Sequence, residues 1–209
     1  MAGTTTGAPR FPGRSAAVLA GGRSSRMGSN KALLEVGGRA MLARTAELLR
    51  PLVDDLFVSA NDPAPYADLG LRVVPDVHRD VGAIGGIHAA IAAAAHPVVL
   101  CVACDMPHLA PAVLELLLGA DAEGADALVP LVGGRPEPLL ALYCRGALPG
   151  FERAIRGGRL RVVDALEGLR VRHVAERDLA AADPGLRSFV NVNTPSELAA
   201  AQAGAPERP

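Results

Sequence analysis

The stretch that decides the fold, residues 15–31, reads SAAVLAGGRSSRMGSNK. Its first six residues form a short, almost continuously apolar run, which is typical of a strand buried on both faces of a sheet. Gly21 and Gly22 end this run, and a polar loop carrying Arg26 and Lys31 follows. Glycines let successive backbone N–H groups approach an anion, and the two cations add positive charge. The stretch therefore predicts a buried strand followed by a loop that binds a phosphate chain.

Lys31 is unusual in the whole chain. Of the 21 lysine and arginine residues, it is the one lysine. It follows Gly28 by three residues and no Ser or Thr comes after it, so the loop is not a Walker A motif, nor does it contain G-x-G-x-x-G. Arginine supplies the surface charge elsewhere, whereas lysine offers a compact ammonium group on a flexible stem. Lys31 is therefore a candidate for a role that arginine does not fill.

Outward from this stretch, apolar runs alternate with helical patterns. Further strands are expected at 56–60, 71–74, 98–103, 127–132, 139–144, 170–175 and 188–192; helices are expected at 41–52, 82–95 and 148–155, and from Pro111 and Pro195, with Thr194 as the N-cap of the last. This alternation predicts an α/β fold with a mainly parallel sheet. Such sheets bind ligands beyond the carboxyl ends of their strands. We expect one domain over 15–203, with tails at 1–14 and 204–209.

Composition excludes several classes of protein. Half of the 209 residues are hydrophobic and 21% are charged, so the chain is not disordered as a whole. A net charge of −1 argues against a general nucleic-acid or membrane-surface binder. No apolar run approaches the length of a membrane span, and the N-terminal segment lacks the apolar core of a signal peptide. These features predict a cytoplasmic protein.

Cys101 and Cys104 form a C-x-x-C pattern that is usually associated with redox chemistry or zinc. Here the pattern lies in the apolar run 98–103, and residues three apart on a strand point to opposite faces. No second cysteine pair completes a zinc site. We therefore expect these cysteines, with Cys144, to be structural residues in a reducing compartment.

Polar side chains follow two of the expected strands. Asp105 ends the apolar run 98–103, opposite the phosphate loop, where one carboxylate can hold Mg²⁺ together with substrate phosphates. Asn191 and Asn193 place two amides on one face of the late strand 188–192. Each group also has a simpler interpretation, since Asp105 precedes Pro107 and can form a turn, and the asparagines can cap the helix that follows.

Together, these motifs resemble those of the molybdenum cofactor guanylyltransferases, the MobA family. The resemblance rests on five ordered segments: LAGG with RMG and KALL at 19–34, GAIGG at 82–86, CDMP at 104–107, RPEPL with ALY at 135–143, and FVNVNTP at 189–195. They span most of the chain. The resemblance implies a Rossmann-like three-layer α/β/α nucleotidyltransferase fold. It also implies transfer of GMP from Mg-GTP to the terminal phosphate of the molybdenum–pterin cofactor, with release of pyrophosphate.

Site residues follow from the resemblance position by position. Those matching GTP contacts are Leu19, Ala20, Gly21, Lys31 and Asp76, and Asp105 matches a residue that contacts both GTP and Mg²⁺. The positions that the family associates with the pterin side or the active site are matched by Gly82, Gly86, Arg161, Asn191 and Asn193. The chain departs from the family at Asn30, where Asp is common, and at Ser59, which aligns with a nucleotide-contacting Asn. Ser59 is therefore a weak candidate for the base contact, and Asn61 stands two residues further on. Molybdenum-insertion and molybdoenzyme-maturation proteins are implied partners.

The mechanism we expect needs no covalent enzyme intermediate, because the acceptor phosphate is already an anion. The backbone at Gly21-Gly22, with Arg26 and Lys31, would hold the triphosphate. Asp105, with Asn193, would hold Mg²⁺, and Arg161 would steady the acceptor phosphate. Two alternatives remain open at this stage: a CTP-dependent molybdopterin cytidylyltransferase, and a carrier that binds GTP or the cofactor without turnover.

Overall fold

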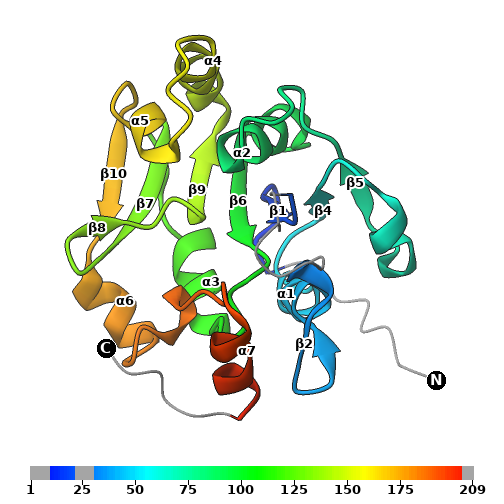
Figure 1. The fold of residues 1–209 in the computed structure, drawn as a ribbon. Helices are drawn as coiled ribbons and strands as arrows, with labels where there is room; N and C mark the ends of the chain where they lie inside the picture. Colours follow the sequence, from blue (N-terminus) through cyan, green and yellow to red (C-terminus); the bar gives the residue numbers. More distant parts are fainter. Residues whose placement is uncertain (1–9, 22–30, 204–209) are drawn as a thin grey trace.

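The computed structural model describes residues 10–21 and 31–203. Gly22 and Arg26 lie outside these ranges. A central sheet of eight strands carries the fold (Figure 1). Its strands are β1 (Ser15–Leu19), β4 (Asp55–Ser59), β5 (Arg72–Val74), β6 (Val98–Ala103), β7 (Ala127–Val132), β8 (Arg135–Pro136), β9 (Leu140–Cys144) and β10 (Val171–Val174).

The strand order is β10-β7-β9-β6-β1-β4-β5, with β8 paired to β7. Pairs β1–β4, β1–β6, β4–β5 and β7–β10 are parallel, whereas β9 runs antiparallel to both β6 and β7. The predicted α/β class with a mainly parallel sheet is confirmed. The short loop between β7 and β9 explains the reversed strand, because antiparallel neighbours need no long crossover.

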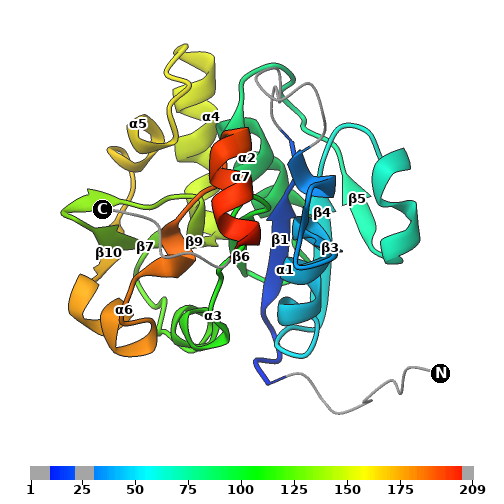
Figure 2. The same cartoon turned by 60° about the horizontal axis from the view of Figure 1, so that its bottom comes forward.

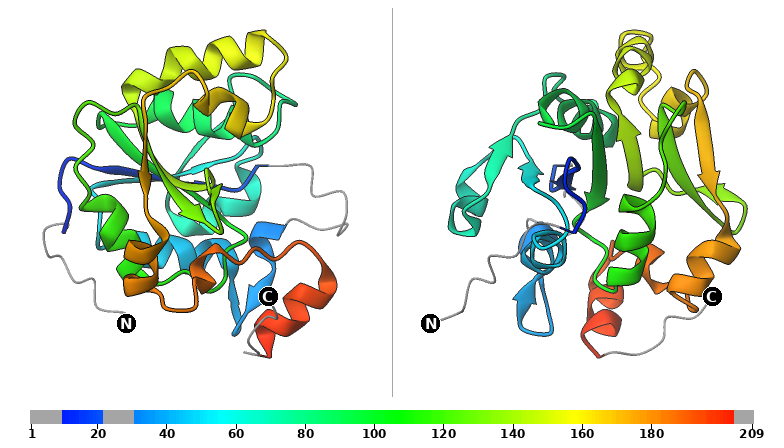
Figure 3. Two further views of the ribbon diagram at one scale, coloured as in Figure 1. Left: turned by 90° about the vertical axis from the view of Figure 1, so that its left-hand side faces the viewer. Right: turned by 180° about the vertical axis from the view of Figure 1, so that it is seen from behind.

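Helices cover both faces of the sheet, as the edge-on view in Figure 3 shows. The helices are α1 (Met41–Leu49), α2 (Ala83–Ala93), α3 (Pro111–Leu118), α4 (Leu148–Arg156), α5 (Val162–Leu166), α6 (Glu176–Ala182) and α7 (Pro195–Gln202). Side chains alternate along β1: Ala16 and Val18 face the core shared with α1, α3 and α6, whereas Ala17 and Leu19 face the core under α2, α4 and α5. The three-layer arrangement follows from this alternation, since each face of the sheet is apolar.

A small hairpin and the last helix form a satellite on the α1 side (Figure 2). Strands β2 (Glu35–Val36) and β3 (Arg39–Ala40) turn through Gly37 and Gly38, both at positive φ, which glycine adopts at little cost. Val36 packs with Ala201 of α7. The predicted cap of α7 is confirmed: Thr194 Oγ1 accepts from the backbone N–H of Glu197, whose carboxylate accepts from the backbone N–H of Thr194.

The strand expected at 188–192 is wrong. Residues Arg187–Phe189 form a 3-10 helix instead, entered through Leu186 at φ 49°. The segment is held by loops: Ser188 Oγ accepts from the Ala110 backbone N–H, and the Val192 backbone N–H donates to the Asp105 carbonyl. Because these partners belong to turns, the segment joins no strand of the sheet in the described residues. No described helix is long and apolar enough to cross a membrane.

Candidate functional site

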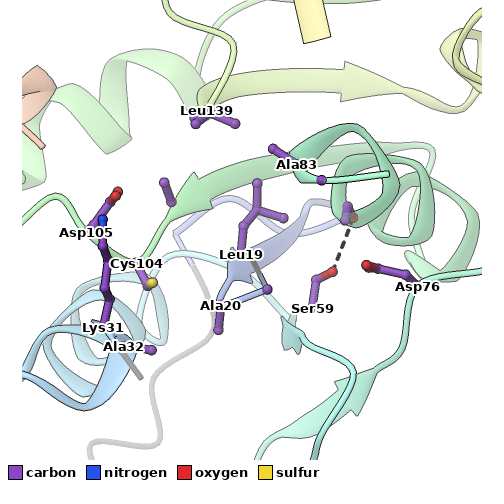
Figure 4. Close-up of a pocket in the computed structure, with 14 residues that line it drawn as sticks. Leu19, Ala20, Lys31, Ala32, Ser59, Asp76, Ala83, Cys104, Asp105 and Leu139 are labelled. Atoms are coloured by element: carbon purple, nitrogen blue, oxygen red, sulfur yellow. Dashed lines mark hydrogen bonds between the residues drawn. The ribbon is translucent and has the colours of Figure 1, made fainter. Parts of the chain in front are cut away.

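A pocket of about 170 Å³ lies at the carboxyl edge of the sheet (Figure 4). The parallel register explains its position, because Leu19 at the end of β1 pairs with Ser59 at the end of β4 and with Ala103 at the end of β6. Of the residues predicted from sequence, the pocket brings together Leu19, Ala20, Gly21, Lys31, Ser59, Asp76, Gly82, Gly86 and Asp105. Residues far apart in the chain therefore meet at one edge, as expected for an α/β sheet.

One end of the pocket is marked by Lys31 and Asp105, drawn next to each other in Figure 4. The Lys31 ammonium donates to Asn193 Oδ1 at 2.8 Å and, at 3.5 Å, to the Val192 carbonyl. Asp105 Oδ1 is buried and has no hydrogen-bond partner among the described residues. Burial raises the pKa of the Asp105 carboxyl, and the charge of Lys31 partly offsets this rise. A buried, unpartnered carboxylate oxygen is a suitable ligand for a cation.

The other end of the pocket is formed by Ser59, Asp76 and the start of α2. The Ser59 hydroxyl donates to the Gly86 carbonyl at 3.2 Å, the dashed line in Figure 4. Burial raises the pKa of the Asp76 carboxyl above the usual range, while a hydrogen bond from Asn61 and the charge of His88 act in the opposite direction. This end therefore presents the partly buried Asp76 carboxylate as a hydrogen-bond acceptor, at the opposite end of the pocket from Lys31.

The glycines at the start of α2 allow the helix to approach Asp76 closely. A Cβ on Gly85 would lie 2.8 Å from the His78 carbonyl, which the backbone cannot accommodate without a shift. A Cβ on Gly86 would meet Ser59 Oγ at 3.4 Å and Asp76 Oδ1 at 3.8 Å, inside the pocket. Gly82 has φ 79°, a conformation that favours glycine. Gly86 therefore keeps space in the pocket, whereas Gly82 and Gly85 shape the backbone around it.

Three residues expected on the pterin side do not line the pocket. Asn193 contacts it through Lys31, and Asn191 Oδ1 is buried with no partner among the described residues. Arg161 precedes α5, with 80% of its side chain exposed, 4.0 Å from the Asp164 carboxylate. Its assignment to the acceptor phosphate stays a prediction. Ala32 and Leu139 also line the pocket as small or apolar walls; both lie in segments that carry the family resemblance, KALL and RPEPL, but sequence reasoning gave neither residue a role of its own.

The expectation that Cys101 and Cys104 do not act as a pair is supported by their positions. Cys101 belongs to the core under α2 and α4, whereas Cys104 belongs to the core on the α1 and α3 side. Both are buried free thiols, and burial raises the pKa of Cys104 to about 12. Within the described ranges, no group of three or more His, Cys, Asp or Glu side chains can hold a metal ion. Because both thiols are buried and burial raises their pKa, neither is an activated nucleophile.

A pocket beyond the carboxyl ends of parallel strands, with Lys31 and Asp105 at one end and Asp76 at the other, is where α/β folds bind nucleotides. The sequence matches the family described as MobA-like NTP transferase domain over residues 16–195. This match covers most of the chain, which therefore belongs to that family.

Two curated relatives and one solved structure illustrate what the chain is similar to. A probable molybdenum cofactor guanylyltransferase from Pelotomaculum thermopropionicum is 41% identical, with 88% of this chain and 90% of that protein covered. A molybdenum cofactor guanylyltransferase from Pseudomonas aeruginosa is 40% identical, with coverage of 90% and 94%. The crystal structure of molybdopterin-guanine dinucleotide biosynthesis protein A from Archaeoglobus fulgidus superposes with a TM-score of 0.79 at 34% identity, with coverage of 90% and 97%.

Proposed function

We propose that this nucleotidyltransferase transfers GMP from GTP to the terminal phosphate of the molybdenum–pterin cofactor. A phosphate oxygen of the acceptor attacks the α-phosphorus of GTP; the bond from that phosphorus to the bridging oxygen breaks, and pyrophosphate leaves. The observation that carries the proposal is the two-ended pocket, with Lys31 and Asp105 at one end and Asp76 at the other. The guanylyltransferase descriptions of similar proteins support the choice of nucleotide.

The two ends would bind different parts of GTP. The Lys31 ammonium is a point charge on a flexible stem, and it would neutralise the triphosphate as charge moves to the leaving group. Asp76 would repel phosphate and attract donors, so it suits the nucleoside. Guanine presents N1–H and an exocyclic amino group on one edge, and a carboxylate can accept from both. The Lys31 end would therefore assist the approach of the acceptor phosphate to the α-phosphate of GTP, while the Asp76 end would hold the guanine base.

Mg²⁺ fits the Lys31 end, because Asp105 Oδ1 is buried without a partner among the described residues. Asp105 would hold the ion, and Asn193 Oδ1 would join it when the Lys31 ammonium, from which it accepts a hydrogen bond here, turns to the triphosphate. When bound, Mg²⁺ would neutralise phosphate charge and stabilise the leaving pyrophosphate. One or two protein oxygens are sufficient, since Mg²⁺ keeps several waters and takes further ligands from the nucleotide.

The acceptor would enter beside Gly82 and Asn191, with Arg161 steadying its phosphate. The exposed guanidinium of Arg161 can move, and its contact with Asp164 is long at 4.0 Å. We place the reaction in the cytoplasm, where reduced thiols such as the three free cysteines persist. We propose molybdenum-insertion proteins as the source of the molybdenum–pterin substrate, and molybdoenzyme-maturation proteins as the recipients of the guanine dinucleotide product.

One assay tests the proposal against the alternatives. Purified protein is incubated with Mg²⁺, the molybdenum–pterin cofactor and GTP, CTP or ATP in turn, and pyrophosphate is measured. We expect release with GTP at least about tenfold faster than with CTP, the discrimination expected when a buried acceptor loses its donor. Release with CTP instead would identify a cytidylyltransferase. GTP binding without pyrophosphate release would identify a carrier and contradict the proposal.

A further inference from the structure

Asn61 joins residue 76 by two hydrogen bonds at the nucleoside end of the pocket. Its amide Nδ2 donates to Asp76 Oδ2 at 3.0 Å, and its Oδ1 accepts from the Asp76 backbone N–H at 2.9 Å. The two bonds fix the orientation of the amide, because flipping it would place a donor against the backbone N–H and an acceptor against the carboxylate. Asn61 follows β4 and Asp76 follows β5, so the contact also ties together the ends of two neighbouring strands.

The second oxygen of Asp76 remains available to a ligand. Oδ1 lies on the side of Gly86, where a Cβ would approach it to 3.8 Å, and no hydrogen bond to Oδ1 occurs among the described residues. Ser59 offers no equivalent donor for this carboxylate, since its hydroxyl donates to the Gly86 carbonyl. Asn61 therefore sets both the rotation of the Asp76 carboxylate and the direction in which its free oxygen points.

We propose that Asn61 is a positioning residue for nucleoside recognition, which holds Asp76 so that Oδ1 accepts a hydrogen bond from the bound nucleotide. This inference rests on the proposed function, which supplies GTP as the ligand. It assigns a role to a side chain that does not line the pocket. It also explains how the pocket can bind a nucleoside with Ser59 at its position. The Ser59 hydroxyl already donates to the Gly86 carbonyl, so the oriented hydrogen-bond acceptor is the Asp76 carboxylate held by Asn61.

The charged surroundings of Asp76 define how the pair responds to pH. His88 of α2 interacts electrostatically with Asp76, and the pKa of its ring is lowered by burial and by neighbouring His78. Glu152 of α4 lies 3.7 Å from the His88 ring nitrogen. Arg79 and Asp80 are exposed in the loop that follows Asp76. Asn61 donates directly to the Asp76 carboxylate, so replacing Asn61 should change the orientation and the pKa of that carboxylate most.

The decisive variant is Asn61→Asp, which keeps the acceptor for the Asp76 backbone N–H but replaces the donated bond with a second carboxylate. Two carboxylates at this separation share one proton at low pH and repel each other at high pH. We expect the ratio of the variant's KM for GTP to that of wild type to rise with pH, from near one to about tenfold or more, the effect of losing one hydrogen bond to a charged group. The KM for the acceptor should stay within about twofold.

Asn61→Ala and Asp62→Asn complete the test. Asn61→Ala removes the donor without adding charge, so KM for GTP should rise about tenfold, and the acid limb of kcat/KM should move to higher pH. Asp62→Asn is the matched control, because its side-chain oxygen can still accept from the Ala64 backbone N–H, and it should behave as wild type. Asn61 is exposed, so neither substitution removes core packing.

The outcomes separate the inference from the proposed function. An Asn61→Asp variant whose KM for GTP matches wild type at every pH would overturn the positioning role. So would equal changes in both KM values with an unchanged pH profile, since that pattern indicates a merely structural contact. If wild type binds GTP but releases no pyrophosphate, the proposed function fails. The role of Asn61 is then tested by calorimetry, as the ratio of the variant's Kd for GTP to that of wild type across the same pH range.

Discussion

Lys31 is the single residue on which the proposed chemistry depends most. Its ammonium bonds Asn193 Oδ1 at 2.8 Å and its charge acts on Asp105, so it links the loop after the first strand to both candidate metal-holding side chains. Lys31→Ala should lower kcat for GMP transfer by about 10²–10³, the cost of removing one preorganised charge-stabilising group. Pyrophosphate release at saturating GTP measures this loss.

Lys31→Arg separates charge from shape. A planar guanidinium keeps the charge but cannot reproduce a compact ammonium, so we expect it to recover only part of the activity. Arg39→Ala is the control, because Arg39 pairs with Glu47 on the surface of the hairpin region. Full activity in Lys31→Arg would mean that charge alone matters, and that the scarcity of lysine elsewhere in the chain is a coincidence.

Asp105 should contribute to the acid limb of the reaction, together with Asp76. Burial raises the pKa of its carboxyl and Lys31 lowers it, so the folded pKa lies above the usual aspartate range. A cation is held by the ionised form, and activity therefore falls as pH decreases through this raised pKa. Removing the charge of Lys31 should move the acid limb to still higher pH. Profiles of kcat/KM for wild type and Lys31→Ala, at several Mg²⁺ concentrations, check the direction of the shift.

Asp105→Ala provides the complementary measurement. We expect a loss of activity at least as large as that of Lys31→Ala, about 10²-fold or more, because the half-buried carboxylate beside Lys31 is removed. The Mg²⁺ concentration for half-maximal rate should increase. A fully active Asp105→Ala variant would contradict the metal assignment.

At the scale of elements, strand β6 and the turn after it explain why Cys101, in the strand, and Cys104, in the turn, should be dispensable for activity. They face opposite cores, and a serine hydroxyl can replace either thiol with little change in volume. Cys101→Ser and Cys104→Ser should keep near-wild-type turnover, although burying a hydroxyl can cost about 1–3 kcal/mol of stability. Turnover and thermal unfolding are measured together. A large loss of turnover with an unchanged melting temperature would show that the C-x-x-C pattern has chemistry after all.

Most of the strands that the sequence predicted correctly are buried on both faces, whereas β5 and β10, at the two edges of the sheet, are only partly buried. The run at 98–103 could be recognised because nearly every residue is apolar, and β6 packs against both cores. The strand predicted at 188–192 was wrong although Phe189 and Val192 are buried. The Ser188 hydroxyl accepts from the Ala110 backbone N–H and the Val192 backbone N–H donates to the Asp105 carbonyl, so the segment bonds loops and not a strand. The two-residue strands of the hairpin and the five-residue α5 are too short for a periodic pattern.

The candidate site was predictable where it depends on strand ends. Asp105 follows β6, Asp76 follows β5 and Lys31 comes after β1 in the chain, and parallel strands bring their carboxyl ends together. The Asn61–Asp76 contact could not be predicted in the same way, since it needs the register between β4 and β5 and the rotation of an amide. Arg26 and Gly22, both predicted to hold phosphate, lie outside the described residues.

At the scale of the whole molecule, strand order places the pocket. β1 lies between β4 and β6, so the chain leaves it toward β4 and β5 on one side and reaches β6 on the other. This reversal is the switch point at which α/β sheets open a crevice. The pocket is lined by the ends of β1, β4 and β6 and by the start of α2. A ligand that occupies it therefore contacts both the sheet and the helical layer that contains α2.

A ligand bound there should therefore stabilise the entire domain. At a free concentration of 100 Kd, one ligand that binds only the folded state adds about 2.7 kcal/mol, and each kcal/mol raises Tm by about 2–4 °C for a chain of this size. GTP with Mg²⁺ should thus raise Tm by about 5–11 °C, whereas CTP at the same concentration should raise it much less. Asp105→Asn should remove the part of the shift that requires Mg²⁺ and leave a smaller one from the nucleoside end. Equal shifts from GTP and CTP would contradict guanine recognition at Asp76, whatever the rate of transfer.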